Sequence, residues 1–261
     1  MRNLPVIGRI FYGIAIAVMG LQTIYYSDFP YMLIPPKHSS IPGLGIIAYV
    51  FGAMLILAGV CIVFEKKIRP ASLLLGSILL LIFCFYFIPY QFMANPNFMQ
   101  FGEWENAEKE LALAGSAFVI AGYFSGESEN FIIVFLTKLI PLGAILFSLA
   151  IICFGISHLL YPTDVADYMP SWIPFKIFWA YFTGTALIGS GIAIILKIKL
   201  RLIATLLGIM ILSWFILVHI PKVIASPFAY RGSEVTSAFL ALAYSGIAFV
   251  IAGATKNNSS K

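Results

Sequence analysis

The chain contains an internal repeat, because its two halves match over most of their length. The segments GSAFVIAG at 115–122 and GIAFVIAG at 246–253 are nearly identical. Further matches lie about 132 positions apart, with small drifts in the offset. The matching pairs are Gly20 and Gly155, Pro35 and Pro170, Tyr49 and Tyr181, Gly52 and Gly184, Gly59 and Gly191, Arg69 and Arg201, Gly76 and Gly208, Pro89 and Pro221, and Glu103 and Glu234. Such an offset is typical of a duplicated unit. We therefore predict two copies of one module, at 1–127 and 128–261.

The composition indicates an integral membrane protein. Hydrophobic residues make up 61% of the chain and charged residues only 10%, whereas soluble domains are roughly half apolar and a quarter charged. Crossing the hydrocarbon core of a bilayer takes about 20 apolar residues in a helix. Runs of this kind lie at 6–26, 43–64, 70–89, 107–124, 131–160, 174–196, 201–219 and 235–254. Because the apolarity is continuous rather than alternating, we predict an all-α fold of eight transmembrane helices in two tandem four-helix bundles.

The distribution of charge predicts the orientation of these helices. An even number of spans per copy makes the two copies parallel, unlike the inverted repeats of many transporters. On this topology eleven Lys and Arg residues fall on one side and five on the other, so both termini are expected in the cytoplasm. The net charge of +5 then reflects topology, and no nucleic-acid partner is predicted. The run from Ile10 to Tyr26 lacks a cleavage site and is expected to belong to the fold rather than to a signal peptide.

Small residues recur at matching places in the two copies. Ala48 and Gly52 reappear as Ala180 and Gly184, and the pair Gly115 and Gly122 reappears as Gly246 and Gly253. Small residues in transmembrane helices let a neighbouring backbone approach closely. We therefore interpret these positions as helix-packing sites.

The three cysteines do not indicate redox chemistry of their own. Cys61, Cys84 and Cys153 lie on different predicted helices, and the sequence has no C-x-x-C motif that would supply a dithiol. A quinone-linked disulfide generator is therefore not expected. We interpret all three as small apolar residues.

The predicted outer connectors, at 25–43, 88–106, 160–174 and 220–232, are rich in proline and aromatic residues. Two interpretations remain open: an aromatic belt at the membrane surface, or an aromatic cap over a pocket. Near these connectors Lys109, Glu110 and Glu234 lie at predicted helix starts. We interpret the carboxylates of Glu110 and Glu234 as groups that complement the helix dipole.

Two histidines lie at the outer ends of helices in the second copy. His158 is near the end of the span at 131–160, and His219 precedes Pro221 at the end of the span at 201–219. The first copy has Thr23 and Phe87 at these positions. Three interpretations remain open: interfacial side chains, hydrogen-bonding groups for a quinone or another lipid-soluble ligand, or ligands of a haem or transition metal.

Several further polar residues accompany the histidines. Gln22, Ser157, Thr183 and Thr185 either line the same region or make hydrogen bonds between helices. His38 lies in the first outer connector and is expected in solvent.

The second copy resembles the DoxX family of small four-helix membrane proteins. The resemblance rests on GISHLLYPTDVADYMPSWIPFKIFWAYFTGTALIGSGIAIIL at 155–196 and VHIPKV at 218–223, and the first copy resembles longer members through ELALAGSAFVIAG at 110–122. His158, Pro170, Trp172, Pro174 and Gly184 fall on the family pattern, whereas the first copy has Thr23 and Pro36 where the histidine and the Ser-Trp pair are expected. Any activity that the resemblance implies therefore rests on the second copy.

The resemblance implies a role near quinone-linked sulfur oxidation and membrane redox complexes. The first hypothesis is an accessory or quinone-interacting subunit of a redox system in the bacterial plasma (inner) membrane, with partner proteins in that membrane. The alternatives are a transporter or channel for a small solute between the two bundles, and a structural membrane partner without chemistry. The expected cofactor is a quinone, with haem as the less favoured candidate. The candidate ligand-binding residues are His158, His219, Trp172, Thr183 and Ser157.

Overall fold

The first half of the chain forms four principal helices in the computed structural model, which describes residues 3–30, 33–34, 44–124 and 130–254. Within these residues there is no β-strand. The elements are α1 (Leu4–Tyr26), α2 (Leu44–Val63), α3 (Ile68–Ile82), the π-helical turn η1 (Phe83–Phe87), α4 (Ile88–Ala94), the 3₁₀ turn η2 (Phe101–Trp104) and α5 (Glu105–Tyr123). The predicted span at 70–89 thus corresponds to the continuous run of α3, η1 and α4.

The second half repeats this order with more breaks. Its elements are α6 (Phe131–Leu136), η3 (Thr137–Leu142), α7 (Gly143–Leu160), α8 (Pro162–Tyr168), α9 (Lys176–Ile195), α10 (Leu200–Trp214), the π-helical turn η4 (Phe215–His219), α11 (Ile220–Ala225), η5 (Ala229–Arg231) and α12 (Ser233–Ala254). The predicted span at 131–160 is interrupted by η3, a 3₁₀ segment that contains Pro141. Proline lacks the amide hydrogen that an α-helix needs at this point.

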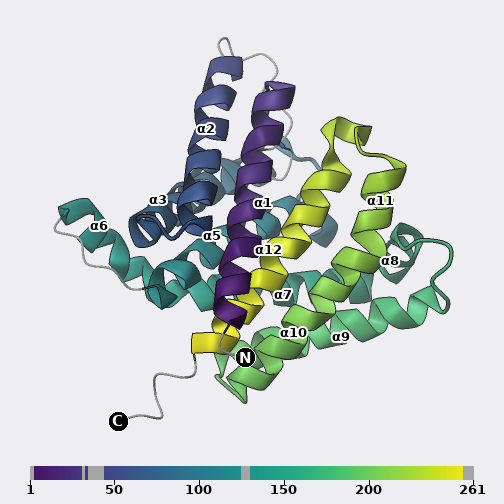
Figure 1. The fold of residues 1–261 in the computed structure, drawn as a ribbon. Coiled ribbons are helices and arrows are strands. Elements are labelled where there is room, and N and C mark those ends of the chain that lie inside the picture. Colours follow the sequence, from purple (N-terminus) through teal and green to yellow (C-terminus); the bar gives the residue numbers. More distant parts are fainter. Residues whose placement is uncertain (1–2, 31–32, 35–43, 125–129, 255–261) are drawn as a thin grey trace.

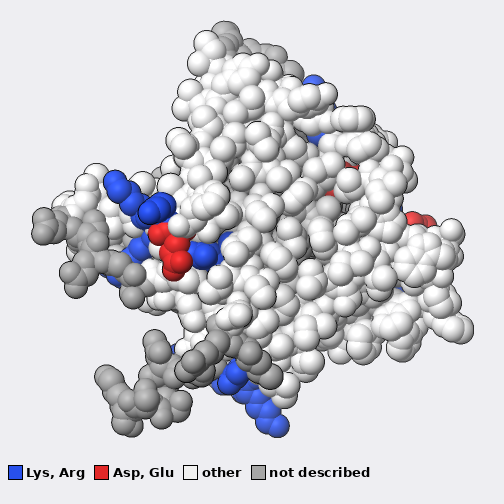
Figure 2. Space-filling model, in the orientation of Figure 1, with Lys and Arg blue, Asp and Glu red and all other residues white. Residues whose placement is uncertain are grey.

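Within the described part of the chain, seven helical segments are long and apolar enough to cross a membrane. The span predicted at 107–124 corresponds to α5, which is outside this set. Its first two turns carry Glu105, Glu108, Lys109 and Glu110, so the apolar part of the helix is short. Figure 2 shows a surface that is largely uncharged in this view, with the charged atoms gathered in a few places. Large apolar side chains such as Phe85, Leu57 and Ile224 are more than 60% exposed, which suits contact with lipid.

The helices of the two repeats are interleaved. Within each repeat the first helix packs on the second, as α1 on α2 and α7 on α9, and the third packs on the fourth, as α3 on α5 and α10 on α12. Between repeats, the first helix of each packs on the last helix of the other, so that α1 lies along α12 (Figure 1) and α5 packs on α7. One continuous apolar core includes Tyr12 and Leu113 from the first half and Phe147 and Ile247 from the second. The predicted repeats at 1–127 and 128–261 therefore share a core.

Glycines make these helix contacts close, as predicted for Gly52, Gly184, Gly115 and Gly246. A Cβ atom on Gly115 would lie 2.8 Å from the backbone oxygen of Gly143, and one on Gly155 would lie 2.6 Å from the backbone oxygen of Gly184. Real Cβ atoms are not found so close to backbone oxygens. Gly246 and Gly8 face each other in the same way where α12 meets α1. The interpretation of these positions as packing sites is confirmed.

Candidate functional site

A cavity of about 780 Å³ lies among the helices of the second repeat. Its walls come from α7, α8, α9, α10, η4 and α12, together with η2 and the first turns of α5 from the first repeat. Small-molecule sites in proteins commonly have volumes of about 300–1,000 Å³. The cavity is therefore large enough for a ligand of cofactor size.

The π-helical turn η4 brings His219 to the cavity wall. Pro221 has no amide hydrogen, and just before it the backbone N–H of Ile220 donates to the carbonyl oxygen of Phe215, five residues earlier. Turns of this kind change which face of a helix a side chain occupies and are frequent at functional sites. The first repeat has the same turn before Pro89, and there it places Phe87 in the core, where this side chain is 1% exposed.

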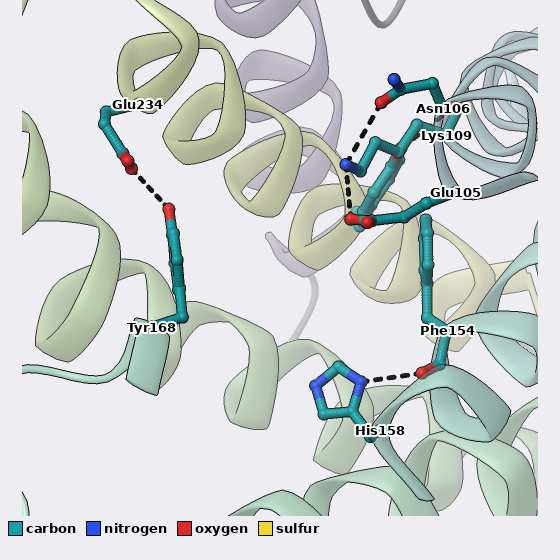
Figure 3. A network of polar contacts seen from close by, with 8 residues as sticks. Glu105, Asn106, Lys109, Phe154, His158, Tyr168 and Glu234 are labelled. Atoms are coloured by element: carbon teal, nitrogen blue, oxygen red, sulfur yellow. Dashed lines mark hydrogen bonds and ion pairs between the residues drawn. The ribbon is translucent and has the colours of Figure 1, made fainter. Parts of the chain in front are cut away.

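His158 lines the cavity, and a hydrogen bond to the backbone determines which of its two ring nitrogens keeps a free lone pair. His158 lies in the last turn of α7, and its Nδ1 is 2.7 Å from the carbonyl oxygen of Phe154. A carbonyl only accepts, so Nδ1 carries the hydrogen and a neutral ring keeps its lone pair on Nε2. Figure 3 shows the Nε2 side of the ring turned away from Phe154. His158 can therefore accept a hydrogen bond from a ligand.

Two further polar atoms at the cavity wall have no hydrogen-bond partner within the described part of the chain. They are Oγ of Ser157 and Nδ1 of His219, and both are buried. Buried polar atoms in native proteins nearly always have a partner, and leaving one without costs about 1–3 kcal/mol. Together with Nε2 of His158, these atoms form a set of hydrogen-bonding groups on one cavity.

Charged and phenolic groups also line the cavity, among them Glu105, Lys109, Tyr168 and Glu234 (Figure 3). Nζ of Lys109 is 2.6 Å from a carboxylate oxygen of Glu105, one turn earlier in α5. The Tyr168 hydroxyl donates to Glu234 at 2.5 Å, and Nζ of Lys222 lies 3.8 Å from the centre of the Tyr168 ring. Burial, and then the bond to Glu234, raise the pKa of Tyr168, so its hydroxyl stays protonated as a donor. These contacts tie α8, which carries Tyr168, to α12.

Four of the five predicted site residues line this cavity: His158, His219, Ser157 and Thr183. The hydroxyl of Thr183 donates to the carbonyl oxygen of Trp179 at 2.7 Å, so it is already satisfied within α9. Trp172 does not belong to the lining and is 59% exposed. His38 lies outside the described residues.

Gln22 and Thr185 do not join the site. Gln22 donates to the carbonyl oxygen of Gly232 at 2.9 Å, which links α1 to the start of α12. Thr185 donates to the carbonyl oxygen of Tyr181 on the exposed side of α9. The interpretation as a hydrogen bond between helices applies to Gln22, which also accepts from the hydroxyl of Thr236 in α12. Neither interpretation applies to Thr185, because its bond lies within α9.

Several lining residues were not predicted as part of a site. Glu105, Tyr168 and Tyr244 were not singled out, Lys109 was noted only as lying at a helix start, and Glu234 was interpreted only as a helix-dipole residue. Glu234 does lie in the first turn of α12, whereas Glu110 lies beyond the first turn of α5 and is 0% exposed. The dipole interpretation of Glu110 is therefore wrong. The spacing of Glu105 and Lys109 was a usable signal, because residues four apart share one face of a helix.

The outer connectors contribute a cap to the cavity. Tyr161 and Tyr168, at the two ends of α8, line it, and Gly102 from the connector before α5 donates its N–H to the hydroxyl of Tyr161 at 3.4 Å. Of the two interpretations of these connectors, the aromatic cap applies to this part of 160–174. Phe175 and Phe228 are 82% and 72% exposed, which agrees with an interfacial belt at other positions.

The corresponding place in the first repeat is filled. Thr23, which corresponds to His158, is 0% exposed, and its hydroxyl donates to the carbonyl oxygen of Met19 at 2.8 Å. Phe87, Leu33 and Leu79, which correspond to His219, Tyr168 and Ile211, are at most 1% exposed. The same helix arrangement thus encloses apolar side chains in one repeat and a polar-lined cavity in the other.

We expect Tyr168→Phe to loosen α8. The substitution removes the hydrogen bond to Glu234 and leaves the aromatic ring in place, which is worth about 1 kcal/mol for a half-buried bond. Hydrogen–deuterium exchange measured by mass spectrometry should become faster in 162–168. Tyr25→Phe, at a side chain that is 71% exposed, is the control. Unchanged exchange in Tyr168→Phe would show that this bond does not hold the cap.

Within the described residues, no group of three or more His, Cys, Asp and Glu side chains is arranged to hold a metal ion. Comparison with known proteins adds no family: no family model, curated protein or solved structure matches the chain.

Proposed function

We propose that the protein binds a quinone in the cavity of the second repeat. Its role is that of an accessory or quinone-interacting subunit of a redox system in the bacterial plasma membrane. The observation that carries the proposal is that Ser157 and His158 from α7 and His219 from η4 line one cavity, with two buried polar atoms among them that lack a partner in the described residues.

The chemistry of a quinone fits this set. A quinone offers two carbonyl oxygens that accept hydrogen bonds, and the quinol offers two hydroxyl groups that donate. Neutral imidazole and serine hydroxyl groups serve as donor and acceptor, so they suit both forms. Ile151, Leu187 and Ile211 line the cavity and are less than 10% exposed, which gives the ring an apolar surface to pack against. The resemblance of 155–196 to the DoxX family supports the same proposal.

The membrane arrangement is part of the proposal. We propose that α5 also crosses the bilayer, which gives eight crossings, two parallel four-helix repeats and both termini in the cytoplasm. Most of α5 is buried, which supports this proposal. The charged first turns of α5 then lie against other helices of the protein, at the end of α5 that faces the outer membrane surface. The bacterial origin rests on the family resemblance alone.

Transport between the two repeats has less support. The contacts between α1 and α12, and between α5 and α7, bring glycine backbones together and leave little room for a solute at those points. A purely structural role does not explain the buried polar atoms of Ser157 and His219. The cavity therefore favours ligand binding over either alternative.

Quinone titration tests the proposal. Trp214 lines the cavity, so a bound quinone should quench its fluorescence in a saturable way. We expect short-chain ubiquinone or menaquinone to bind, and His158→Leu to weaken binding about tenfold, which corresponds to the loss of one hydrogen bond of about 1.4 kcal/mol. Thr185→Val, which removes a hydroxyl on the exposed side of α9, is the control and should bind like the wild type.

Two results would contradict the proposal. One is a protein that carries no quinone when purified with its native lipids and shows no saturable quenching. The other is a stoichiometric Soret band that is lost in His158→Leu, because this would assign the histidines to a haem.

A further inference from the structure

Glu110 is a buried carboxyl group that the proposed quinone site does not use. It lies in the second turn of α5 and is 0% exposed. Neither of its carboxyl oxygens has a hydrogen-bond partner in the described part of the chain. The neighbouring cation, Lys109, is paired with Glu105 at 2.6 Å and so is already neutralised. An ionised carboxylate in such a place would be very unfavourable, and a protonated one much less so.

Two tyrosines from different repeats hold this part of α5. The hydroxyl of Tyr12 in α1 donates to the carbonyl oxygen of Leu113 at 2.8 Å, and that of Tyr244 in α12 donates to the carbonyl oxygen of Lys109 at 3.0 Å. Both phenolic hydrogens are therefore committed to the backbone of α5 on either side of Glu110. This leaves Glu110 without a donor from either ring.

The repeat relates Glu110 to the cavity. At the offset that joins Glu103 to Glu234, Glu110 corresponds to Ala241, which lines the cavity in the second repeat. The first repeat thus has a carboxyl group at the position where the second repeat has a residue of its cavity wall. Tyr244 connects the two places, because it lines the cavity and bonds to α5 at the residue next to Glu110.

We propose that Glu110 is a proton-binding site linked through Tyr244 to the cavity. The carboxyl group holds a proton at neutral pH, and a ligand that displaces the ring of Tyr244 changes the environment of that proton. The second part rests on the proposed quinone binding, whereas the first does not. Other titratable or charged side chains on α5 and on the elements packed around it, together with Tyr12 of α1, are Arg69, Cys84, Tyr86, Glu103, Glu105, Glu108, Lys109, Tyr123, Lys138, Cys153, His158, Glu234 and Tyr244.

Infrared spectroscopy tests the proton site without any ligand. Glu108 is also buried and has a carboxyl oxygen without a partner in the described residues, so the measurement is made in a Glu108→Gln background. There we expect the carbonyl stretching band of a protonated carboxyl group at neutral pH, and we expect Glu110→Gln to remove it. Glu65→Gln is the control, because that carboxylate is 57% exposed and paired with Arg9, and it should leave the band unchanged. Glu110→Asp keeps the carboxyl group and should shift the band, which covers the case that Glu110→Gln does not fold. A band that survives Glu110→Gln, or that Glu108→Gln removes instead, would overturn the proposal.

Adding short-chain ubiquinone tests the link. We expect the band to shift in the wild type and to stay in place in Tyr244→Phe, while Trp214 fluorescence still reports quinone binding in both. Bound quinone with an unmoved band in the wild type would refute the link to the cavity. Absence of fluorescence quenching would instead refute the proposed function. The carboxyl band measured without ligand would still establish or exclude the proton site.

Discussion

Gly246→Leu is expected to prevent the two repeats from assembling. A Cβ atom at this position would collide with the backbone oxygen of Gly8, where α12 lies along α1. The backbone of a helix cannot change conformation to make room as a flexible side chain can, so the two helices must separate. Overpacking in a well-packed core costs about 1–3 kcal/mol even when side chains adjust, and here the loss should be larger.

The measurement is the yield of monodisperse protein after extraction in mild detergent, together with its thermal unfolding. Gly189→Leu is the matched control, because Gly189 is also in the middle of a helix and a Cβ atom there meets nothing within 4 Å. We expect the control to behave like the wild type and Gly246→Leu to be lost or aggregated. Equal yield and stability of the two variants would show that α1 and α12 do not pack as described.

His219→Phe is expected to abolish quinone binding and to stabilise the fold. The substitution places in the second repeat the residue that fills the corresponding position of the first, Phe87. It removes a buried nitrogen without a partner in the described residues, a group that costs about 1–3 kcal/mol. For a chain of this size each kcal/mol shifts the melting temperature by about 2–4 °C.

The reciprocal change, Phe87→His, is the matched control. It introduces a polar ring where the side chain is 1% exposed, so we expect the melting temperature to fall while quinone binding is unchanged. Fluorescence titration and thermal unfolding of both variants give the comparison. A His219→Phe protein that binds quinone as tightly as the wild type would remove His219 from the site.

The sequence determined the class of fold and the sites of close packing. Continuous apolar runs predict membrane-crossing helices because a bilayer leaves backbone groups no partner except those in the same helix. The described residues contain seven helical segments that are long and apolar enough for this. The glycines at 52, 184, 115 and 246 were predictable as packing sites because each lies within an apolar helix and recurs in the second copy. The histidines were predictable as candidates because polar side chains are uncommon at such positions.

The tertiary structure alone decided which residues meet. Sequence does not show that α12 packs on α1, or that α5 from the first repeat forms a wall of the cavity in the second. These contacts join residues that are distant in the sequence, such as Lys109 and Tyr244, which lie 135 positions apart. For the same reason Glu110, in the charged first part of α5, was interpreted as a helix-dipole residue although it lies beyond the first turn and is 0% exposed. Trp172 matched the family pattern, but the chain turns after α8 and leaves it 59% exposed. Local patterns specify helices and their apolar faces, whereas the neighbours of each face depend on how all the helices pack together.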